Sequence, residues 1–157
     1  MTSYLLDTSV INRICDGKTS ADTWSPFYIT DLVLLELTRV RDTSRREKLL
    51  DVLRGRLGPG GILRSEGLVT SWHHEVDDFD NPYDTRMLPL GRPFPRILSS
   101  IGISHQQHWR DAFIVQAAMT HDLTLVTAYK NQVKGARRCH VNVELVGQAA
   151  VPKLCSE

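Results

Sequence analysis

The sequence predicts a single α/β domain in which a parallel β-sheet is covered by helices on both faces. Short apolar runs with strand character alternate along the chain with segments of helical periodicity, and this alternation favours a parallel sheet. A length of 157 residues, with 41% hydrophobic and 24% charged residues, suits one domain with its own core. In such sheets the functional groups gather at the carboxyl ends of the strands.

The individual elements follow from apolar runs, capping residues and helix breakers. The expected strands are residues 4–6, 27–29, 62–70, 123–127 and 141–145. Four helices are expected. The first is capped by Thr8 and Ser9 and ends at Gly17, and the second is capped by Thr30 and Asp31. The third and fourth are residues 43–57 and 105–122. Gly58-Pro59-Gly60-Gly61 is expected to end the third helix, and the proline-rich residues 77–95 are expected to form a long surface loop.

Glu36 lies among apolar residues in the stretch ITDLVLLELTRV. At helical spacing it shares a face with Leu32, Val33 and Val40. A buried carboxylate is costly unless it is paired, hydrogen-bonded or neutralised. An ion pair with Arg39, one helical turn away, is one explanation. The other is that the fold requires a negative charge at this point.

Two further acids are expected at the same end of the sheet. Asp7 ends the first strand, and Asp111 lies near the start of a helix, on the face of Ile114 and Ala118. Three carboxylates from distant segments would repel one another and raise their pKa values, and a divalent cation would relieve that repulsion. For each acid alone a plain structural role stays open, because Asp7 could cap a strand end and Asp111 could favour a helix N-terminus.

Three stretches, YLLDTSVI, ITDLVLLELTRV and RDAFIVQAAMTHDLTLVTA, resemble the successive signatures of PIN-domain ribonucleases, above all the VapC-type toxins of toxin–antitoxin pairs. Asp7, Glu36 and Asp111 match the acids of that pattern in the correct order. The resemblance implies a PIN-like nuclease domain over residues 1–150, followed by a short C-terminal tail, 151–157. Family members often carry a fourth acid after the last strand, where this chain has TAYKNQ and no acid.

The resemblance implies an endoribonuclease that hydrolyses RNA phosphodiester bonds with Mg²⁺ or Mn²⁺, as the toxin of a type II pair. Asp7, Glu36 and Asp111 would be both its catalytic residues and its metal ligands. The side chains expected to support these acids or a metal-bound water are Thr8, Ser9, Asn12, Thr127 and Asn131. The implied partners are RNA, a cognate VapB-type antitoxin and a second copy of the chain. A non-catalytic PIN-like module that binds RNA or protein is the alternative.

Two basic stretches are candidates for contacts with RNA phosphates. A solvated helix surface is an equally open interpretation of each residue. The candidates are Arg39, Arg41, Arg45 and Arg46 in the first stretch and Lys130 and Lys134 in the second. Among the aromatic residues, Trp72 and Tyr129 could stack on bases, whereas Trp109 is expected in the core.

Composition and spacing exclude several other classes of protein. The three cysteines are far apart and form no C-x-x-C pair, so a disulfide framework or zinc ribbon is not expected. No stretch resembles a signal peptide or a membrane span, which favours a cytoplasmic protein.

His105 and His108, with Asp111, have a spacing that could bind Zn²⁺ or Ni²⁺, although no fourth ligand is evident. A phosphatase with two acids at the first strand end would need an acid where Ser9 stands.

Overall fold

The computed structural model describes residues 1–64 and 106–147, with side chains from Arg110 onward in the second range. The described part holds a five-stranded sheet with the order β3-β2-β1-β4-β5, and every neighbouring pair is parallel. In chain order the strands are β1 (Tyr4–Leu6), β2 (Phe27–Thr30), β3 (Leu57–Leu63), β4 (Thr124–Thr127) and β5 (Val143–Leu145). The expected parallel α/β architecture is confirmed. Within these residues no helix has the length and apolarity needed to cross a membrane.

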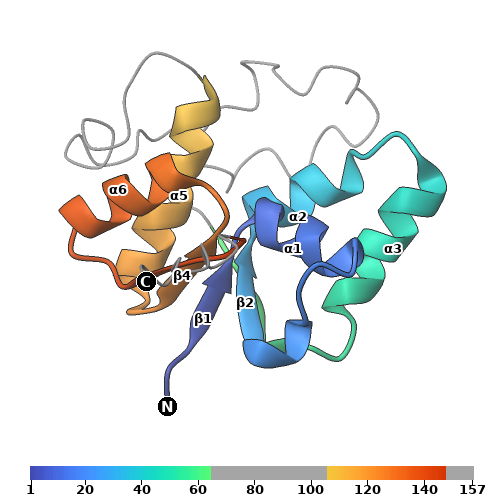
Figure 1. The fold of residues 1–157 in the computed structure, drawn as a ribbon, viewed down its shortest axis with the longest axis horizontal. Helices are drawn as coiled ribbons and strands as arrows, with labels where there is room; N and C mark the ends of the chain where they lie inside the picture. The colour runs from blue at the N-terminus through green and yellow to red at the C-terminus, as the bar shows by residue number, and fades with distance from the viewer. Residues whose placement is uncertain (65–105, 148–157) are drawn as a thin grey trace, which may run out of the picture.

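Helices cover both faces of the sheet (Figure 1). On one side, three helices pack against one another: α1 (Thr8–Cys15), α2 (Asp31–Thr38) and α3 (Thr43–Leu53). On the other side, α5 (Gln106–Thr120) packs against α6 (Lys130–Arg138). Right-handed crossovers produce this division, because the chain first moves outward from β1 to β3 and later returns across the sheet to β4.

Polar residues at the ends of the first two strands begin the helices that follow. The hydroxyl of Thr30 accepts a 3.2 Å hydrogen bond from the backbone N–H of Val33, so the expected cap of α2 is confirmed. The expected cap of α1 at Thr8 and Ser9 is wrong. Asp7 is the N-cap, and its carboxylate accepts a hydrogen bond from the backbone N–H of Ser9.

The chain after α3 differs from the sequence expectation. The helix ends at Leu53, short of residue 57, and β3 begins at Leu57. Gly58-Pro59-Gly60-Gly61 therefore lies within a strand rather than ending a helix. Residues 65–70 of the expected 62–70 strand and the expected loop 77–95 lie outside the described residues.

A bulge makes a glycine-rich strand possible here. Phe27 pairs with Leu57, and Ile29 already pairs with Ile62, so β3 takes a longer path than β2 between the two pairs. Gly60 lies in this segment with a φ of +63°, in the left-handed region that favours glycine. An apolar alternation pattern cannot reveal such a strand.

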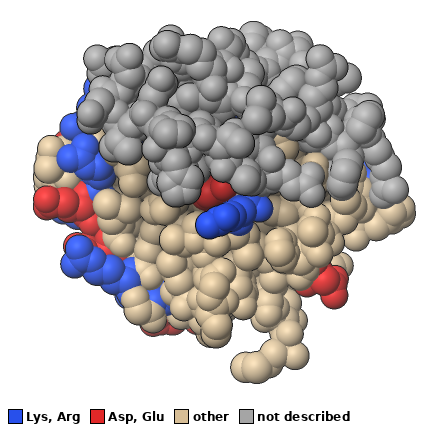
Figure 2. Space-filling view, turned by 180° about the vertical axis from the view of Figure 1, so that it is seen from behind, with Lys and Arg blue, Asp and Glu red and all other residues tan. Residues whose placement is uncertain are grey.

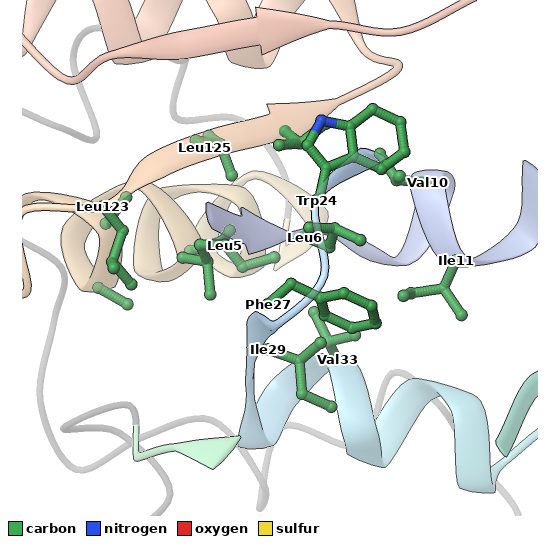
Figure 3. Close-up of a cluster of buried hydrophobic side chains, with 14 of the residues drawn as sticks. Leu5, Leu6, Val10, Ile11, Trp24, Phe27, Ile29, Val33, Leu123 and Leu125 are labelled. Carbon is green, nitrogen blue, oxygen red and sulfur yellow. The ribbon is translucent and has the colours of Figure 1, made fainter. Parts of the chain in front are cut away.

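The core lies between the sheet and the two helical layers. Leu5, Leu6 and Leu125 from the central strands have no exposed surface, and Figure 3 shows them in the same cluster of buried side chains as Trp24. The indole nitrogen of Trp24 donates a 3.3 Å hydrogen bond to Oε1 of Glu144 on β5, which connects the short 3₁₀ helix η1 (Ala21–Thr23) to the sheet edge. Close packing of this kind holds the carboxyl ends of β1 and β4 in fixed positions.

Candidate acidic site

The order in which strands are added to the sheet reverses at its centre, between the parallel strands β1 and β4. From β1 the chain leads through α1 to β2, whereas β4 on the other side leads through α6 to β5. Because the two helices cover opposite faces, a crevice forms at the carboxyl ends of such a strand pair. Asp7 directly follows β1, and Thr127 is the last residue of β4, so both lie at this crevice.

A pocket of about 200 Å³ lies at this crevice. Three of its lining residues are the acids Asp7, Glu36 and Asp111, which come from the start of α1, from α2 and from α5. The remaining lining residues are Thr8, Arg110, Ile114 and Tyr129. Three distant segments of the chain thus bring their carboxylates to one pocket.

Asp7 is the most buried of the three acids, with 2% of its surface exposed. Its Oδ1 accepts the hydrogen bond from the N–H of Ser9, and its Oδ2 accepts a 2.7 Å bond from the hydroxyl of Thr127. Burial raises the pKa of Asp7, the two hydrogen-bonding partners oppose that rise, and the charge of Glu36 adds to it. A positive charge in the pocket would therefore stabilise the ionised carboxylate.

Glu36 is half-buried, and both of its carboxylate oxygens have partners. The hydroxyl of Thr8 donates to Oε2, and Nη1 of Arg110 lies 2.9 Å from Oε1. Within the described residues the ion pair of Glu36 is thus with Arg110 and not with Arg39, whose pairing was one of the two explanations that the sequence left open. Arg39 is the half-buried C-cap residue of α2.

Arg110 is a site residue that the sequence reasoning missed, although it directly precedes Asp111 in the stretch RDAFIV. The side chains expected at the site were acids, hydroxyls and amides, and none of them is basic. A basic residue beside the last acid was the available signal, because three converging carboxylates require a compensating positive charge.

Tyr129 lies within the electrostatic influence of the three acids. Its side chain lines the pocket, although the residue is 52% exposed. Burial is the first cause that raises the pKa of Tyr129, and the charges of Asp7, Asp111 and Glu36 follow. The three carboxylates therefore act on the pKa of the same phenol, in agreement with their places in one pocket.

The expected supporting hydroxyls lie around the acids. Thr8 and Thr127 bond to Glu36 and Asp7, as described above. The Ser9 hydroxyl accepts a 3.0 Å hydrogen bond from the N–H of Ala128, so it anchors the turn after β4. Two side-chain hydrogen bonds, Thr127 to Asp7 and Ala128 to Ser9, thereby connect the start of α1 to the end of β4.

The two expected asparagines are not brought to the pocket. The amide of Asn12 donates a 3.0 Å hydrogen bond to the carbonyl of Thr8, and its Oδ1 accepts a 2.9 Å bond from Nη2 of Arg45. Asn12 therefore connects α1 to α3. Asn131 is exposed on α6 and is not one of the residues that line the pocket.

The donor set fits a hydrated divalent cation. Carboxylate and water oxygens are the ligands that Mg²⁺ and Mn²⁺ prefer. Among the described side chains, no three from His, Cys, Asp and Glu lie close enough together to hold a metal ion by themselves. A cation in this pocket would keep several water ligands, as Mg²⁺ commonly does. The alternative ligands His105 and His108 lie outside the described side chains.

The expected basic residues differ in how far they are engaged within the chain. Arg45 forms an ion pair with Asp16, and Arg46 donates a 3.2 Å hydrogen bond to the carbonyl of Val40. Figure 2 shows Lys and Arg side chains next to Asp and Glu side chains along one edge of the molecule. The exposed candidates are Arg41 before α3 and Lys130 and Lys134 on α6. α6 itself was not expected from the sequence.

The fold and the position of the acids define a PIN-like α/β domain, as the sequence resemblance implies. Solved structures confirm this fold. One is VapBC2 from Rickettsia felis bound to a DNA fragment from their promoter, with a TM-score of 0.53 and 18% identity over 92% of this chain and 98% of that chain. Another is a domain of a functionally unknown protein from Methanocaldococcus jannaschii, with a TM-score of 0.54 and 15% identity over 96% of this chain and 94% of that chain.

These identities establish a shared fold and nothing about shared chemistry. No protein-family model matches the sequence, and no curated protein sequence matches it. The chemistry must therefore be inferred from the pocket itself.

Proposed function

We propose that this chain is a Mg²⁺-dependent endoribonuclease that hydrolyses RNA phosphodiester bonds. The observation that carries the proposal is that Asp7, Glu36 and Asp111 line one pocket at the carboxyl ends of the central strands. Hard carboxylate oxygens at the carboxyl ends of parallel strands suit metal-assisted phosphoryl chemistry. The sequence resemblance to PIN-domain ribonucleases supports the same activity.

Asp7 and Asp111 would hold the cation, with Mn²⁺ able to replace Mg²⁺. A bound cation would supply polarisation of a phosphoryl oxygen and a lower pKa for the attacking water. Thr127 and Ser9 fix the orientation of Asp7 through the two hydrogen bonds to its carboxylate. Thr8 orients Glu36, which would position the attacking water. In the reaction one P–O bond forms to the water oxygen, another breaks, and the departing oxygen takes a proton.

The proposed biological role is that of the toxin in a type II toxin–antitoxin pair in the cytoplasm. The fold shared with the VapBC2 structure and the sequence resemblance to VapC-type toxins support this role. A VapB-type antitoxin would inhibit the enzyme by placing an arginine against the carboxylates of the pocket. The resemblance also implies a homodimer.

The direct test is cleavage of a labelled single-stranded RNA by the purified chain. We expect cleavage with Mg²⁺ or Mn²⁺, none after chelation with EDTA, and none by the Asp7→Asn and Asp111→Asn variants. Circular dichroism of both variants checks that they remain folded. Cleavage that persists in EDTA, or full activity in either variant, contradicts the proposal.

The second candidate is a non-catalytic module that binds RNA or protein. Two observations favour it: Arg110 already neutralises Glu36, and the segment after β4 offers no fourth acid. A Mn²⁺ titration separates the two candidates, because the module would neither bind Mn²⁺ at the pocket nor cleave RNA.

A further inference from the structure

Arg110 gives the acidic pocket a positive charge supplied by the chain itself. Its guanidinium lies among the lining residues and pairs with Glu36, and 27% and 28% of the two side chains are exposed. A pair of this kind is partly screened by water and is therefore open to exchange with another ligand. Arg110 and Asp111 are adjacent on α5, so the guanidinium and the last acid reach the pocket from the same helix.

A divalent cation held by Asp7 and Asp111 would share the pocket with the guanidinium of Arg110, and the two positive charges cannot both lie near Glu36 without cost. Both oxygens of this carboxylate already accept hydrogen bonds, one from Thr8 and one from Arg110. A cation that approaches Glu36 meets the positive guanidinium, and like charges at short distance repel. Binding of the cation should therefore weaken the ion pair between Arg110 and Glu36.

An RNA substrate supplies a second partner for the displaced guanidinium. A phosphodiester is anionic, and a pocket lined by three carboxylates would repel it. The planar fork of an arginine matches the oxygens of a phosphate and can donate two parallel hydrogen bonds. Arg110 already stands inside this pocket, so it needs only a side-chain movement to reach a bound phosphate.

We propose that Arg110 alternates between two partners: Glu36 in the metal-free protein and a phosphate of the RNA when the cation is bound. The proposal rests on the proposed nuclease function and adds a substrate-binding residue to it. In the resting protein the arginine offsets the charge of Glu36, one of the three acids, and during catalysis it binds a phosphate of the substrate. Removal of the guanidinium should therefore affect cation binding and RNA binding in opposite directions.

The test compares Arg110→Gln with Arg110→Lys and with Arg54→Gln as a matched control. Arg54 also pairs with a carboxylate, Asp51 at 3.1 Å, but this pair is highly exposed and lies at the C-terminal end of α3, outside the pocket. Mn²⁺ affinity is measured by calorimetry on the metal-free protein. RNA affinity is measured with a labelled single-stranded RNA, with Ca²⁺ in place of Mg²⁺ and a gel to confirm that the RNA stays intact.

We expect Arg110→Gln to bind Mn²⁺ about fivefold more tightly than wild type and RNA about tenfold more weakly. Arg110→Lys should recover part of the RNA affinity because it keeps the charge without the fork. Arg54→Gln should match wild type in Mn²⁺ affinity. Simple structural damage would lower both affinities together and would also lower the melting temperature.

Two results would overturn the proposal for Arg110 while leaving the nuclease function intact. One is Mn²⁺ affinity in Arg110→Gln no higher than in Arg54→Gln, and the other is unchanged RNA affinity in Arg110→Gln. A wild-type protein that neither binds Mn²⁺ nor cleaves RNA would overturn both the nuclease function and the role of Arg110. The failure of one proposal is therefore distinguishable from the failure of the other.

Discussion

The hydroxyl of Thr127 donates a 2.7 Å hydrogen bond to Oδ2 of Asp7 and thereby joins the ends of the two central strands, β1 and β4. Thr127 is fully buried, and its oxygen also accepts a 3.1 Å hydrogen bond from the N–H of Tyr129. One side chain thus orients the buried acid and fixes the entry to α6. Such outer contacts commonly set the geometry of metal-binding carboxylates.

Replacement of Thr127 by Val should weaken cation binding more than it weakens the fold. The methyl group preserves the packing, but Asp7 loses a hydrogen-bond donor that lowers its pKa. We expect a loss of about 1 kcal/mol in the free energy of unfolding and roughly a tenfold to hundredfold loss in Mn²⁺ affinity. Urea unfolding and a Mn²⁺ titration measure the two effects. Thr124→Val, at the other end of β4, is the control, and equal Mn²⁺ affinity in both variants would contradict the role of Thr127.

The stability of the metal-free protein should fall as the pH rises above the acidic range. Because burial raises the pKa of Asp7 above its ordinary value of 3.8, folding disfavours the ionised form. The contribution of Asp7 to the free energy of unfolding is therefore fully present below the pKa of the unfolded state. It is lost as the pH rises through the higher pKa of the folded state.

The Asp7→Asn variant has no carboxylate at this position, so it should not lose stability as the pH rises. In EDTA at neutral pH the variant should be more stable than wild type, and the difference should shrink as the pH falls toward the acidic range. Added Mn²⁺ should stabilise only the wild type. Urea unfolding at several pH values tests this expectation. A variant less stable than wild type at neutral pH in EDTA would show that the hydrogen bonds of the carboxylate outweigh the cost of its burial.

Glu36→Gln should reduce RNA cleavage strongly while the fold changes little. The amide can still accept the hydrogen bond from Thr8, but it loses the charge that pairs with Arg110. Since this pair is partly exposed, its loss should cost about 1 kcal/mol or less in stability. Glu47→Gln on the exposed part of α3 is the charge-matched control. Cleavage rates and melting temperatures give the comparison, and equal cleavage by the two variants would remove Glu36 from the site.

The exposed lysines of α6 should contribute more to RNA binding than Arg45 does. Lys130 and Lys134 lie one helical turn apart on an exposed surface next to Tyr129, whereas Arg45 is held by Asp16 and Asn12. The double variant Lys130→Ala, Lys134→Ala should bind RNA more weakly. The slope of log affinity against log salt concentration should become shallower by the amount that about one to two lost phosphate contacts would cause. Arg45→Ala should change neither. Binding measured over a salt series decides this, and an unchanged slope in the double variant would exclude α6 from the RNA interface.

The three acids could be predicted from sequence because each has a local signal. Asp7 follows an apolar strand, and Glu36 interrupts an apolar helical face, so both positions need a chemical reason. Asp111 lies on a helical face with Ile114 and Ala118. Parallel topology then requires strand ends to meet at one edge of the sheet, and the pocket confirms that the three acids come together.

The remaining elements depend on tertiary contacts that carry no local pattern. β3 is formed by pairing with β2 across a bulge at Gly60, and the glycines of that strand read as helix breakers in isolation. α6 is strongly basic, and only two buried positions, Val133 and Ala136, give it an apolar stripe. The pairing of Arg110 with Glu36 joins residues far apart in the chain, so helical spacing pointed to Arg39 instead.

The most direct test of the account is a Mn²⁺ titration of the metal-free protein, followed by electron paramagnetic resonance. We expect saturable Mn²⁺ binding by the wild type and loss of that binding in Asp7→Asn and in Asp111→Asn, with both variants still folded. Absence of binding in the wild type, or equal binding in all three proteins, would contradict the claim that the converging acids form a cation site.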